Sequence, residues 1–327
     1  ISGSSRIRRT PYSQRVEEAG VKSYTVYNHM LLATVFETLE YDYSHLKKAV
    51  QVWDVSVQRQ IEIKGTDATK LLQMTTPRDL SKMKDDQCYY ILMVDKEGFI
   101  INDPVAVKLE NDRYWISIAD SDVIYYFKGL AESLNLKVKI FEPDVNIISI
   151  HGPKSKILVE KMFGKEASEL KFFRHKKITF KDKEMIIARS GWSHQICYEV
   201  YVEGFCYGQP MWDELFKLGK DLNVRAGCPN LIERIESGLL SYGNDINSTH
   251  NLYEAGLGKF LSAGISKGCL AYEKLSSISN PKKMIKPIEI KGSPIQPITY
   301  NSKVTNNLGD VIGQISSAAW SRDFKVN

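Results

Sequence analysis

A single carboxylate stands inside an apolar stretch of this sequence. Asp103 follows Phe99, Ile100, Ile101 and Asn102 and is followed by Pro104-Val105-Ala106-Val107. Burying a charged side chain is costly unless it is paired or has a task. Two interpretations remain open on the residues alone. Asp103 is either a binding-site or catalytic group, or the turn aspartate of an ordinary Asn-Asp-Pro sequence.

The segment around Asp103 has the pattern of a β-hairpin. Residues 88–94 favour one strand, Asp95-Lys96-Glu97-Gly98 favours a tight turn, and residues 99–108 favour a second strand. Tyr90 precedes Asp103 by thirteen positions, on the expected partner strand. Tyr90 is therefore either a neighbour of this carboxylate or a plain core aromatic.

Further elements are expected on both sides of this hairpin. We expect Asp67 to cap the helix that follows it. Helices are predicted at 41–49, 68–74, 123–134, 156–162, 209–218 and 229–240, and strands at 51–56 continuing through 59–64, 115–118, 145–150, 177–180, 185–189 and 198–202. Two β–α–β–β units of similar length predict an α+β fold with two related subdomains, rather than a doubly wound parallel sheet.

The composition changes near Lys282, where Pro and Gly punctuate short apolar runs. This pattern predicts a small all-β module. We expect a main region at 1–278 and a C-terminal module at 279–327 with too few strands to close a barrel. Because the chain begins at Ile1 rather than Met, we also expect the given sequence to be cropped.

Composition excludes several classes of protein. With 327 residues, 43% hydrophobic and a net charge of +5, the chain is ordinary globular material without the basic blocks of a nucleic-acid surface. Five cysteines without a C-x-x-C pair predict reduced thiols in a cytoplasmic protein. The histidines are dispersed, so no metal site is expected. No apolar run is long enough for a membrane span, and no signal peptide is expected.

Seven blocks of the sequence resemble the folate-dependent aminomethyltransferases of the glycine cleavage system. They are V-W-D-V-S (52–56), E-G-F-I-I-N-D (97–103), I-H-G-P (150–153), A-R-S-G-W…Y-E-V (188–200), E-R-I-E-S-G-L-L-S-Y-G-N-D (233–245), Y-E-A-G-L (253–257) and I-G-Q-I-S-S (312–317). The resemblance implies a ring of two interleaved, ferredoxin-like α+β subdomains plus a C-terminal β-barrel, with tetrahydrofolate bound at the centre.

A second set of blocks resembles one branch of that family, the tetrahydrofolate-dependent dimethylsulfoniopropionate demethylases. They include R-R-T-P (8–11), T-V-Y-N-H-M-L-L (25–32), I-A-D-S-D-V-I (118–124), L-K-F-F (170–173) and G-C-P-N-L-I-E-R-I-E-S (227–237). Leu231 stands where the aminomethyltransferases usually have arginine. This branch implies methyl transfer from a small sulfonium carboxylate to tetrahydrofolate, by a monomer or homodimer without a metal.

Three other functions stay open. The first is a glycine-cleavage aminomethyltransferase, and the second is a folate-binding scaffold without activity. The third is a demethylase for another onium donor, because Ile196 and Cys197 stand where the demethylases tend to have glycines.

The resemblance also implies residue roles. Asp103 would be catalytic at the folate N5, and Tyr90, Glu199 and Arg234 would bind the folate. Arg234 could instead pair with Glu233 or Glu236. A sulfonium offers no N–H, so aromatic faces suit it. Trp192, Tyr198 and Met30 are expected at this donor, with Phe172 or Phe173 as a further wall. The sequence identifies no cation for the donor's carboxylate.

Overall fold

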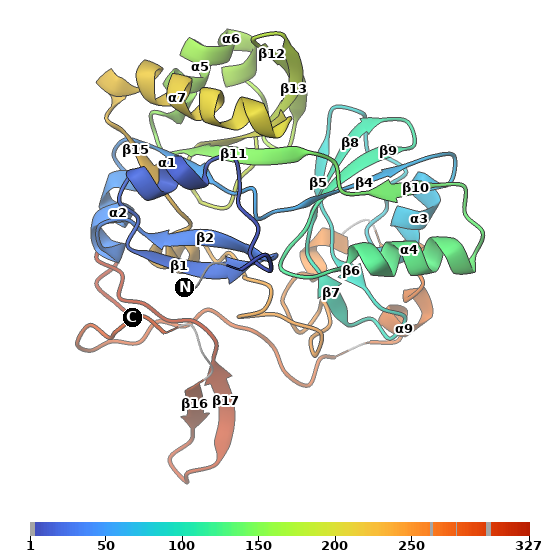
Figure 1. The fold of residues 1–327 in the computed structure, drawn as a ribbon. Coiled ribbons are helices and arrows are strands. Elements are labelled where there is room, and N and C mark those ends of the chain that lie inside the picture. Colours follow the sequence, from blue (N-terminus) through green and yellow to red (C-terminus); the bar gives the residue numbers. More distant parts are fainter. Residues whose placement is uncertain (1–3, 262–263, 279, 299–301) are drawn as a thin grey trace.

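Two β-sheets form the framework of the protein (Figure 1). The structure is a computed structural model that describes residues 4–261, 264–278, 280–298 and 302–327. The larger sheet has six strands in the order β12 (His175–Phe180), β13 (Lys183–Ala188), β14 (Cys197–Glu203), β11 (Val145–His151), β3 (Val50–Asp54) and β15 (Val224–Gly227). The smaller has five, in the order β10 (Lys139–Phe141), β4 (Gln60–Lys64), β9 (Arg113–Ser117), β8 (Val105–Glu110) and β5 (Cys88–Tyr90).

The chain crosses between the two sheets twice. Strand β3 lies in the six-stranded sheet and β4 in the five-stranded one, whereas β10 and β11 make the return crossing. The prediction of one strand continuing over 51–64 is therefore wrong. The Ser56 N–H donates to the Asp54 carboxylate (3.1 Å) and the Gln58 N–H donates to the Val55 carbonyl (2.9 Å), so the chain turns at this point.

Each sheet is covered by helices on one face. Helices α1 (Ser13–Glu18), α5 (Ser155–Phe163), α6 (Lys165–Ser168) and α7 (Gly208–Leu218) enclose one core with the six-stranded sheet. Helices α3 (Ala68–Thr75) and α4 (Ile124–Ser133) enclose a second core with the five-stranded sheet. A third core, which includes Trp53, Trp115 and Tyr201, lies between the two sheets. The predicted α+β class with interleaved subdomains is confirmed.

The remaining elements are short. They are α2 (Leu39–Leu46), α8 (Leu231–Glu236), α9 (Tyr272–Ser276), the hairpins β1 (Ser23–Tyr27)–β2 (Met30–Val35), β6 (Met93–Val94)–β7 (Ile100–Asn102) and β16 (Ser302–Thr305)–β17 (Val311–Ile315), and 3-10 turns at Phe205–Tyr207, Lys220–Leu222 and Gly258–Leu261.

Two local predictions differ from the structure. Asp67 does not cap α3; its carboxylate instead accepts the Lys137 N–H (2.7 Å) and joins the start of α3 to the segment before β10. The helix predicted at 229–240 is shorter. The Asn230 side chain caps α8 at its start, and Gly238, with φ +64°, takes the chain out of the helix.

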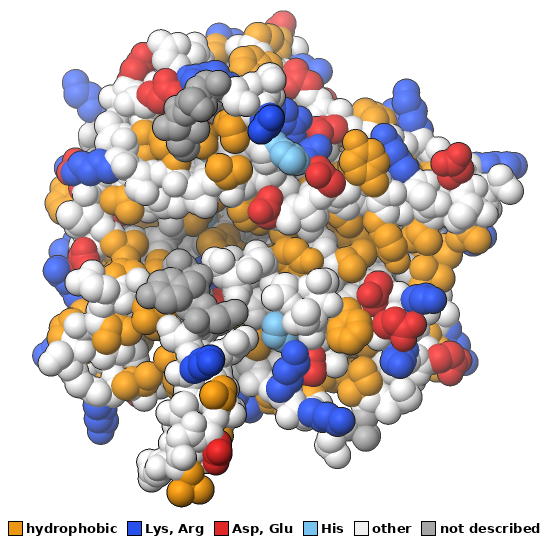
Figure 2. Space-filling model, turned by 60° about the horizontal axis from the view of Figure 1, so that its bottom comes forward, with side chains coloured by type: hydrophobic (Ala, Val, Ile, Leu, Met, Phe, Trp, Pro, Cys, Tyr) orange, Lys and Arg blue, Asp and Glu red, His pale blue; other side chains and the backbone are white. Residues whose placement is uncertain are grey.

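The C-terminal part projects from the framework as the β16–β17 hairpin (Figure 1). The described residues of this part form no closed barrel. Its tip exposes hydrophobic side chains, among them Leu308, Val311 and Ile312 (Figure 2). In the ranges that the structure describes, no helix is both long and apolar enough to span a membrane. All five cysteines are free thiols.

Candidate active site

Asp103 lies at a break between two strands, not within one. The turn predicted at 95–98 is confirmed, with Gly98 at φ +82° and its N–H donating to the Asp95 carbonyl (3.0 Å). Each flanking strand is interrupted, however, giving β5 and β6 on one side and β7 and β8 on the other. Asp103 falls between β7 and β8, and its Oδ2 accepts a hydrogen bond from the Tyr90 hydroxyl (3.1 Å).

The Asp103 carboxyl is electrostatically unusual. It is partly buried and makes no ion pair with any residue that the structure describes. Burial raises its pKa to about 7, against the opposing effect of the Tyr90 hydrogen bond. The pKa values of Tyr90, Tyr27 and Tyr242 are also raised. Burial is the larger cause, and the negative charge of Asp103 is the next. The carboxyl group therefore has three neutral tyrosines near it.

An asparagine pair fixes the segments around Asp103. The Asn102 side chain donates to the Ser121 hydroxyl (2.8 Å) and the Ala119 carbonyl (3.1 Å). The Asn28 side chain accepts the Ser121 N–H (2.9 Å) and donates to the Val57 carbonyl (2.8 Å). The tip of the β1–β2 hairpin is thereby tied to the loop that also holds Asn102. This contact carries Tyr27 toward Asp103, and the sequence patterns gave no sign of it.

Glu199 is a buried carboxylate that forms no ion pair within the part of the chain that the structure describes. It lies on β14, where the Gln58 amide donates to Oε1 (3.2 Å) and the Ser190 hydroxyl donates to Oε2. Burial raises its pKa. Because Val57 also bonds Asn28, residues 55–59 connect the surroundings of Glu199 with those of Asp103.

Tyr198 lies on the other side of the six-stranded sheet. It is fully buried in the core under α5 and α6, and its hydroxyl donates to the Ser168 carbonyl. Successive strand residues point to opposite faces, so Tyr198 and Glu199 cannot line the same space. The structure places Tyr198 in the core, on the face of the sheet opposite to Glu199.

Trp192 is carried by a loop, residues 189–196, that is fastened at several points. The Ser193 hydroxyl bonds Nδ1 of the buried His151 (2.7 Å), whose pKa burial lowers to about 3. Glu233 accepts the His194 N–H (3.0 Å) and a Gln195 side-chain N–H (3.1 Å). The Trp192 ring lies beside the Arg234 guanidinium, at 5.7 Å from its central carbon.

Arg234 is paired within the protein. Its Nη1 bonds the Asp245 carboxylate and donates to the Leu239 carbonyl (3.1 Å), and its Nη2 donates to the Ser317 hydroxyl (2.7 Å). Neither Glu233 nor Glu236 is its partner, so both alternative pairings are wrong. With these contacts, Arg234 joins α8 to the C-terminal part.

The other predicted donor residues are scattered. Phe172 is 67% exposed, while Phe173, at φ +58°, packs on the inter-sheet core and accepts the Cys88 N–H at its carbonyl (2.9 Å). Their rings contact each other at 4.6 Å. Met30 is buried at the start of β2, next to the hairpin tip. Among the predicted residues, Tyr90 bonds Asp103, Trp192 lies beside Arg234, and Phe172 contacts Phe173.

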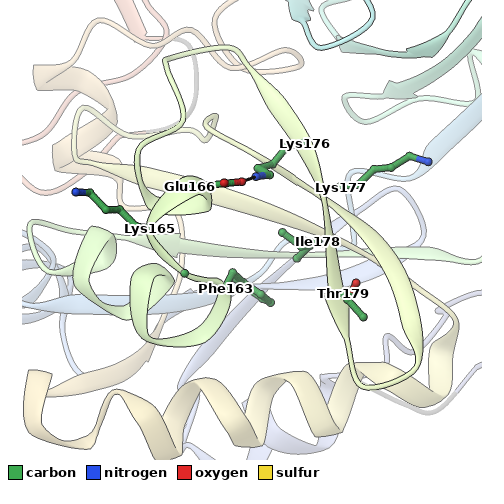
Figure 3. A pocket seen from close by; sticks show the side chains of 8 residues that line it. Phe163, Lys165, Glu166, Lys176, Lys177, Ile178 and Thr179 are labelled. Atoms are coloured by element: carbon green, nitrogen blue, oxygen red, sulfur yellow. Dashed lines mark hydrogen bonds and ion pairs between the residues drawn. The ribbon is translucent and has the colours of Figure 1, made fainter.

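A groove of about 320 Å³ lies elsewhere, at the end of α5 and along β12. It is lined by Phe163, Gly164, Lys165, Glu166, Lys176, Lys177, Ile178 and Thr179 (Figure 3). None of the predicted site residues is part of it. No three His, Cys, Asp or Glu residues in the described ranges are placed to hold a metal ion.

Comparisons with known proteins agree with this architecture. The GCVT N-terminal domain family matches residues 12–264. The dimethylsulfoniopropionate demethylase DmdA of Ruegeria pomeroyi is 48% identical over 100% of this chain and 89% of its own length. An aminomethyltransferase of Caldanaerobacter subterraneus is 27% identical over 89% of this chain and 79% of its own length.

The fold matches a solved structure as well. The glycine cleavage system aminomethyltransferase T from Bartonella henselae superposes with a TM-score of 0.81 at 18% identity, over 98% of this chain and 88% of that one. Because the family matches residues 12–264 and a relative is 48% identical over the whole chain, the chain belongs to the GCVT family.

Proposed function

We propose that this protein transfers a methyl group from dimethylsulfoniopropionate to N5 of tetrahydrofolate, giving 5-methyltetrahydrofolate, 3-methylmercaptopropionate and the proton released from N5. The observation that carries the proposal is the 48% identity, over the whole chain, to the Ruegeria pomeroyi demethylase. The free thiols of all five cysteines support a cytoplasmic setting. We assign the reaction to residues 1–278.

The residues present fit a reduced pterin. The partly buried Asp103 and the buried Glu199 are carboxylates with raised pKa values, and their described hydrogen-bond partners are neutral groups. A carboxylate can accept two parallel N–H bonds, which suits the aminopyrimidine edge of a pterin. We assign Glu199 to this edge, Tyr90 to the ring beside it, and Asp103 to N5.

When bound, tetrahydrofolate supplies the nucleophilic nitrogen. Asp103 holds that nitrogen in position through a hydrogen bond and, once ionised, offsets the positive charge that develops as it is alkylated. Tyr90 keeps Asp103 oriented. The sulfonium already contains a good leaving group, so sulfur needs no general acid, and most of the acceleration comes from placing the two reactants in line.

We revise the proposed donor pocket on the basis of these contacts. Trp192 remains the aromatic face for the sulfonium, while Met30 and Tyr27 supply the wall near Asp103. Tyr198 and the exposed Phe172 are no longer part of the assignment. Arg234 acts on the pocket through its contact with Trp192, since Asp245 and Ser317 occupy its guanidinium.

A second candidate is aminomethyl transfer, which the aminomethyltransferase relatives support at 27% identity. One experiment separates the two. Purified protein is incubated with tetrahydrofolate and dimethylsulfoniopropionate, and 5-methyltetrahydrofolate is followed by chromatography. The expected result is stoichiometric formation of both products. Absence of product, with ammonia released from an aminomethylated lipoyl carrier, would replace the proposal by the second candidate.

A further inference from the structure

A cation without an acidic partner lies next to Tyr90. Arg78 is in the loop after α3, and its guanidinium stacks on the Tyr89 ring at 4.0 Å and lies 5.8 Å from the Phe260 ring. Its Nη1 donates to the Tyr90 carbonyl (2.6 Å). Tyr90 therefore contacts Arg78 through its backbone and Asp103 through its hydroxyl.

The charge of Arg78 is not neutralised by the protein. Across the described ranges no carboxylate forms an ion pair with it, and none of the residues outside those ranges is acidic. Other partly buried arginines do have such partners: Arg59 pairs with Glu142 and Arg113 with Glu62. Burial accordingly lowers the pKa of Arg78. A partly buried, uncompensated charge is costly, and an anion that reached it would remove that cost.

The guanidinium is also open to a ligand. An arginine has five N–H donors, and one nitrogen of Arg78 has an acceptor in the described part of the protein. No unbonded nitrogen of Arg78 is sealed from solvent. The flat guanidinium, backed by the Tyr89 ring, can present two parallel N–H groups, which is the geometry that recognises a carboxylate.

We propose that Arg78 binds the carboxylate of a ligand held at the Tyr90–Asp103 site. The assignment rests on the proposed function, in which both reactants carry carboxylates. One source is the propionate group of the sulfonium, and the other is the glutamate tail of the folate. The Phe260 ring lies 5.0 Å from the Tyr90 ring and 5.8 Å from the Arg78 guanidinium, so it connects Arg78 with the Tyr90–Asp103 site.

Two substitutions and one matched control test the assignment. Arg78→Gln removes the charge, and Arg78→Lys keeps the charge but loses the paired N–H groups. Arg225→Gln is the control, because Arg225 also lies over a tyrosine ring, that of Tyr41 at 5.2 Å, and has no described ion pair, but it is exposed on β15. Circular dichroism and thermal unfolding check that each variant is folded.

The measurements are the KM for dimethylsulfoniopropionate and the Kd of tetrahydrofolate by calorimetry. We expect Arg78→Gln to raise one of these two constants by about 10- to 100-fold and Arg78→Lys to raise the same constant by less. Arg225→Gln should change neither constant. A raised KM for the sulfonium, with unchanged KM for its neutral amide, assigns the propionate. A Kd for tetrahydrofolate that rises to that of tetrahydropteroate, which has no glutamate, assigns the tail.

The outcomes separate this assignment from the proposed function. Wild-type turnover with both constants unchanged in Arg78→Gln overturns the role of Arg78 alone. A wild-type protein that forms no 5-methyltetrahydrofolate overturns the proposed function. The Kd of tetrahydrofolate then decides the role of Arg78, and an unchanged value in Arg78→Gln overturns it.

Discussion

The chemistry of Asp103 depends on the pKa of its carboxyl group. Burial raises the pKa of this carboxyl to about 7, so both of its forms are populated near neutral pH. The Tyr90 hydroxyl favours the ionised form by donating to it, and Tyr90 itself stays protonated because burial raises its own pKa. The carboxyl is thus poised to accept an N–H, and its negative charge is available as positive charge develops nearby.

This balance predicts a pH profile. If the ionised form of Asp103 is the active one, turnover rises with pH through a midpoint near 7. Asp103→Asn should lower the turnover number by about 10²- to 10³-fold and remove the midpoint. Tyr90→Phe removes a hydrogen bond that favours ionisation, so its midpoint should move to higher pH. Rates of 5-methyltetrahydrofolate formation at saturating substrates from pH 5.5 to 8.5 test this; full turnover in Asp103→Asn would refute it.

The same carboxyl predicts a change in stability. Its folded-state pKa lies above the ordinary aspartate value of about 4, so the unfolded chain loses this proton first as the pH rises. Ionisation therefore destabilises the folded state from about pH 4 through 7. Asp103→Asn should raise the free energy of unfolding by about 1–3 kcal/mol at pH 8 and leave it nearly unchanged at pH 4. Urea unfolding at both pH values measures the difference; an equal effect at the two would contradict the assignment.

At the scale of elements, the loop of residues 189–196, which carries Trp192, is bound to the framework at several points. Its Ser190 bonds Glu199, its Ser193 bonds His151, and its residues 194 and 195 bond Glu233. His151 is stacked on Trp53 at 3.6 Å, so the loop is anchored on the inter-sheet core. Trp192 is therefore positioned by bonds on both sides of it in the sequence.

Loosening this loop should affect the two reactants unequally. Ser193→Ala leaves Nδ1 of the buried His151 without its described partner, a loss of about 1–3 kcal/mol. We expect the KM for the sulfonium to rise several-fold while the Kd of tetrahydrofolate stays the same. Ser133→Ala, which removes an exposed hydroxyl bonded to the Leu130 carbonyl on α4, is the control. An equal rise in the KM for the sulfonium and the Kd of tetrahydrofolate would indicate general destabilisation instead.

Local signals predicted local structure. The Asp95–Gly98 turn and the helices on both sheets follow from turn chemistry and periodicity, whereas the contact of Tyr90 with Asp103 was one of two interpretations that the residues left open. Strand alternation could also have placed Tyr198 and Glu199 on opposite faces. The pairing of Arg234 with Asp245 could not be predicted, because Gly238 redirects the chain between them.

Contacts between segments far apart in the chain could not be predicted from the sequence patterns. The sequence over 51–64 alternates like one strand, and nothing local shows that β3 and β4 join different sheets. The contact of Asn28 with Ser121 likewise joins segments far apart in the chain, through side chains common in turns. Such placements come from the packing of whole sheets, which a pattern within a short window does not contain.

At the scale of the molecule, the two crossings make the halves interdependent. Residues 55–59 and 142–144 each lead from one sheet to the other, and the inter-sheet core takes residues from both. The five-stranded half, residues 60–141, is inserted in the chain between β3 and β11 of the six-stranded half, so the larger half is discontinuous and its strands enclose the smaller half in the sequence. The first of these crossings contacts the candidate site, because Gln58 bonds Glu199 and Val57 bonds Asn28.

Residues 4–261 should consequently unfold as one cooperative unit. Leu71→Ala opens a cavity under the five-stranded sheet and Leu215→Ala opens one under the six-stranded sheet, each costing about 2–5 kcal/mol. Scanning calorimetry should give a single transition for the framework in the wild type, and each substitution should move that whole transition to lower temperature. Two transitions, of which each substitution moves a different one, would mean that the halves are independent. A single shared transition would mean that a cavity under either sheet destabilises the whole framework, including the strands next to Asp103 and the strand that carries Glu199.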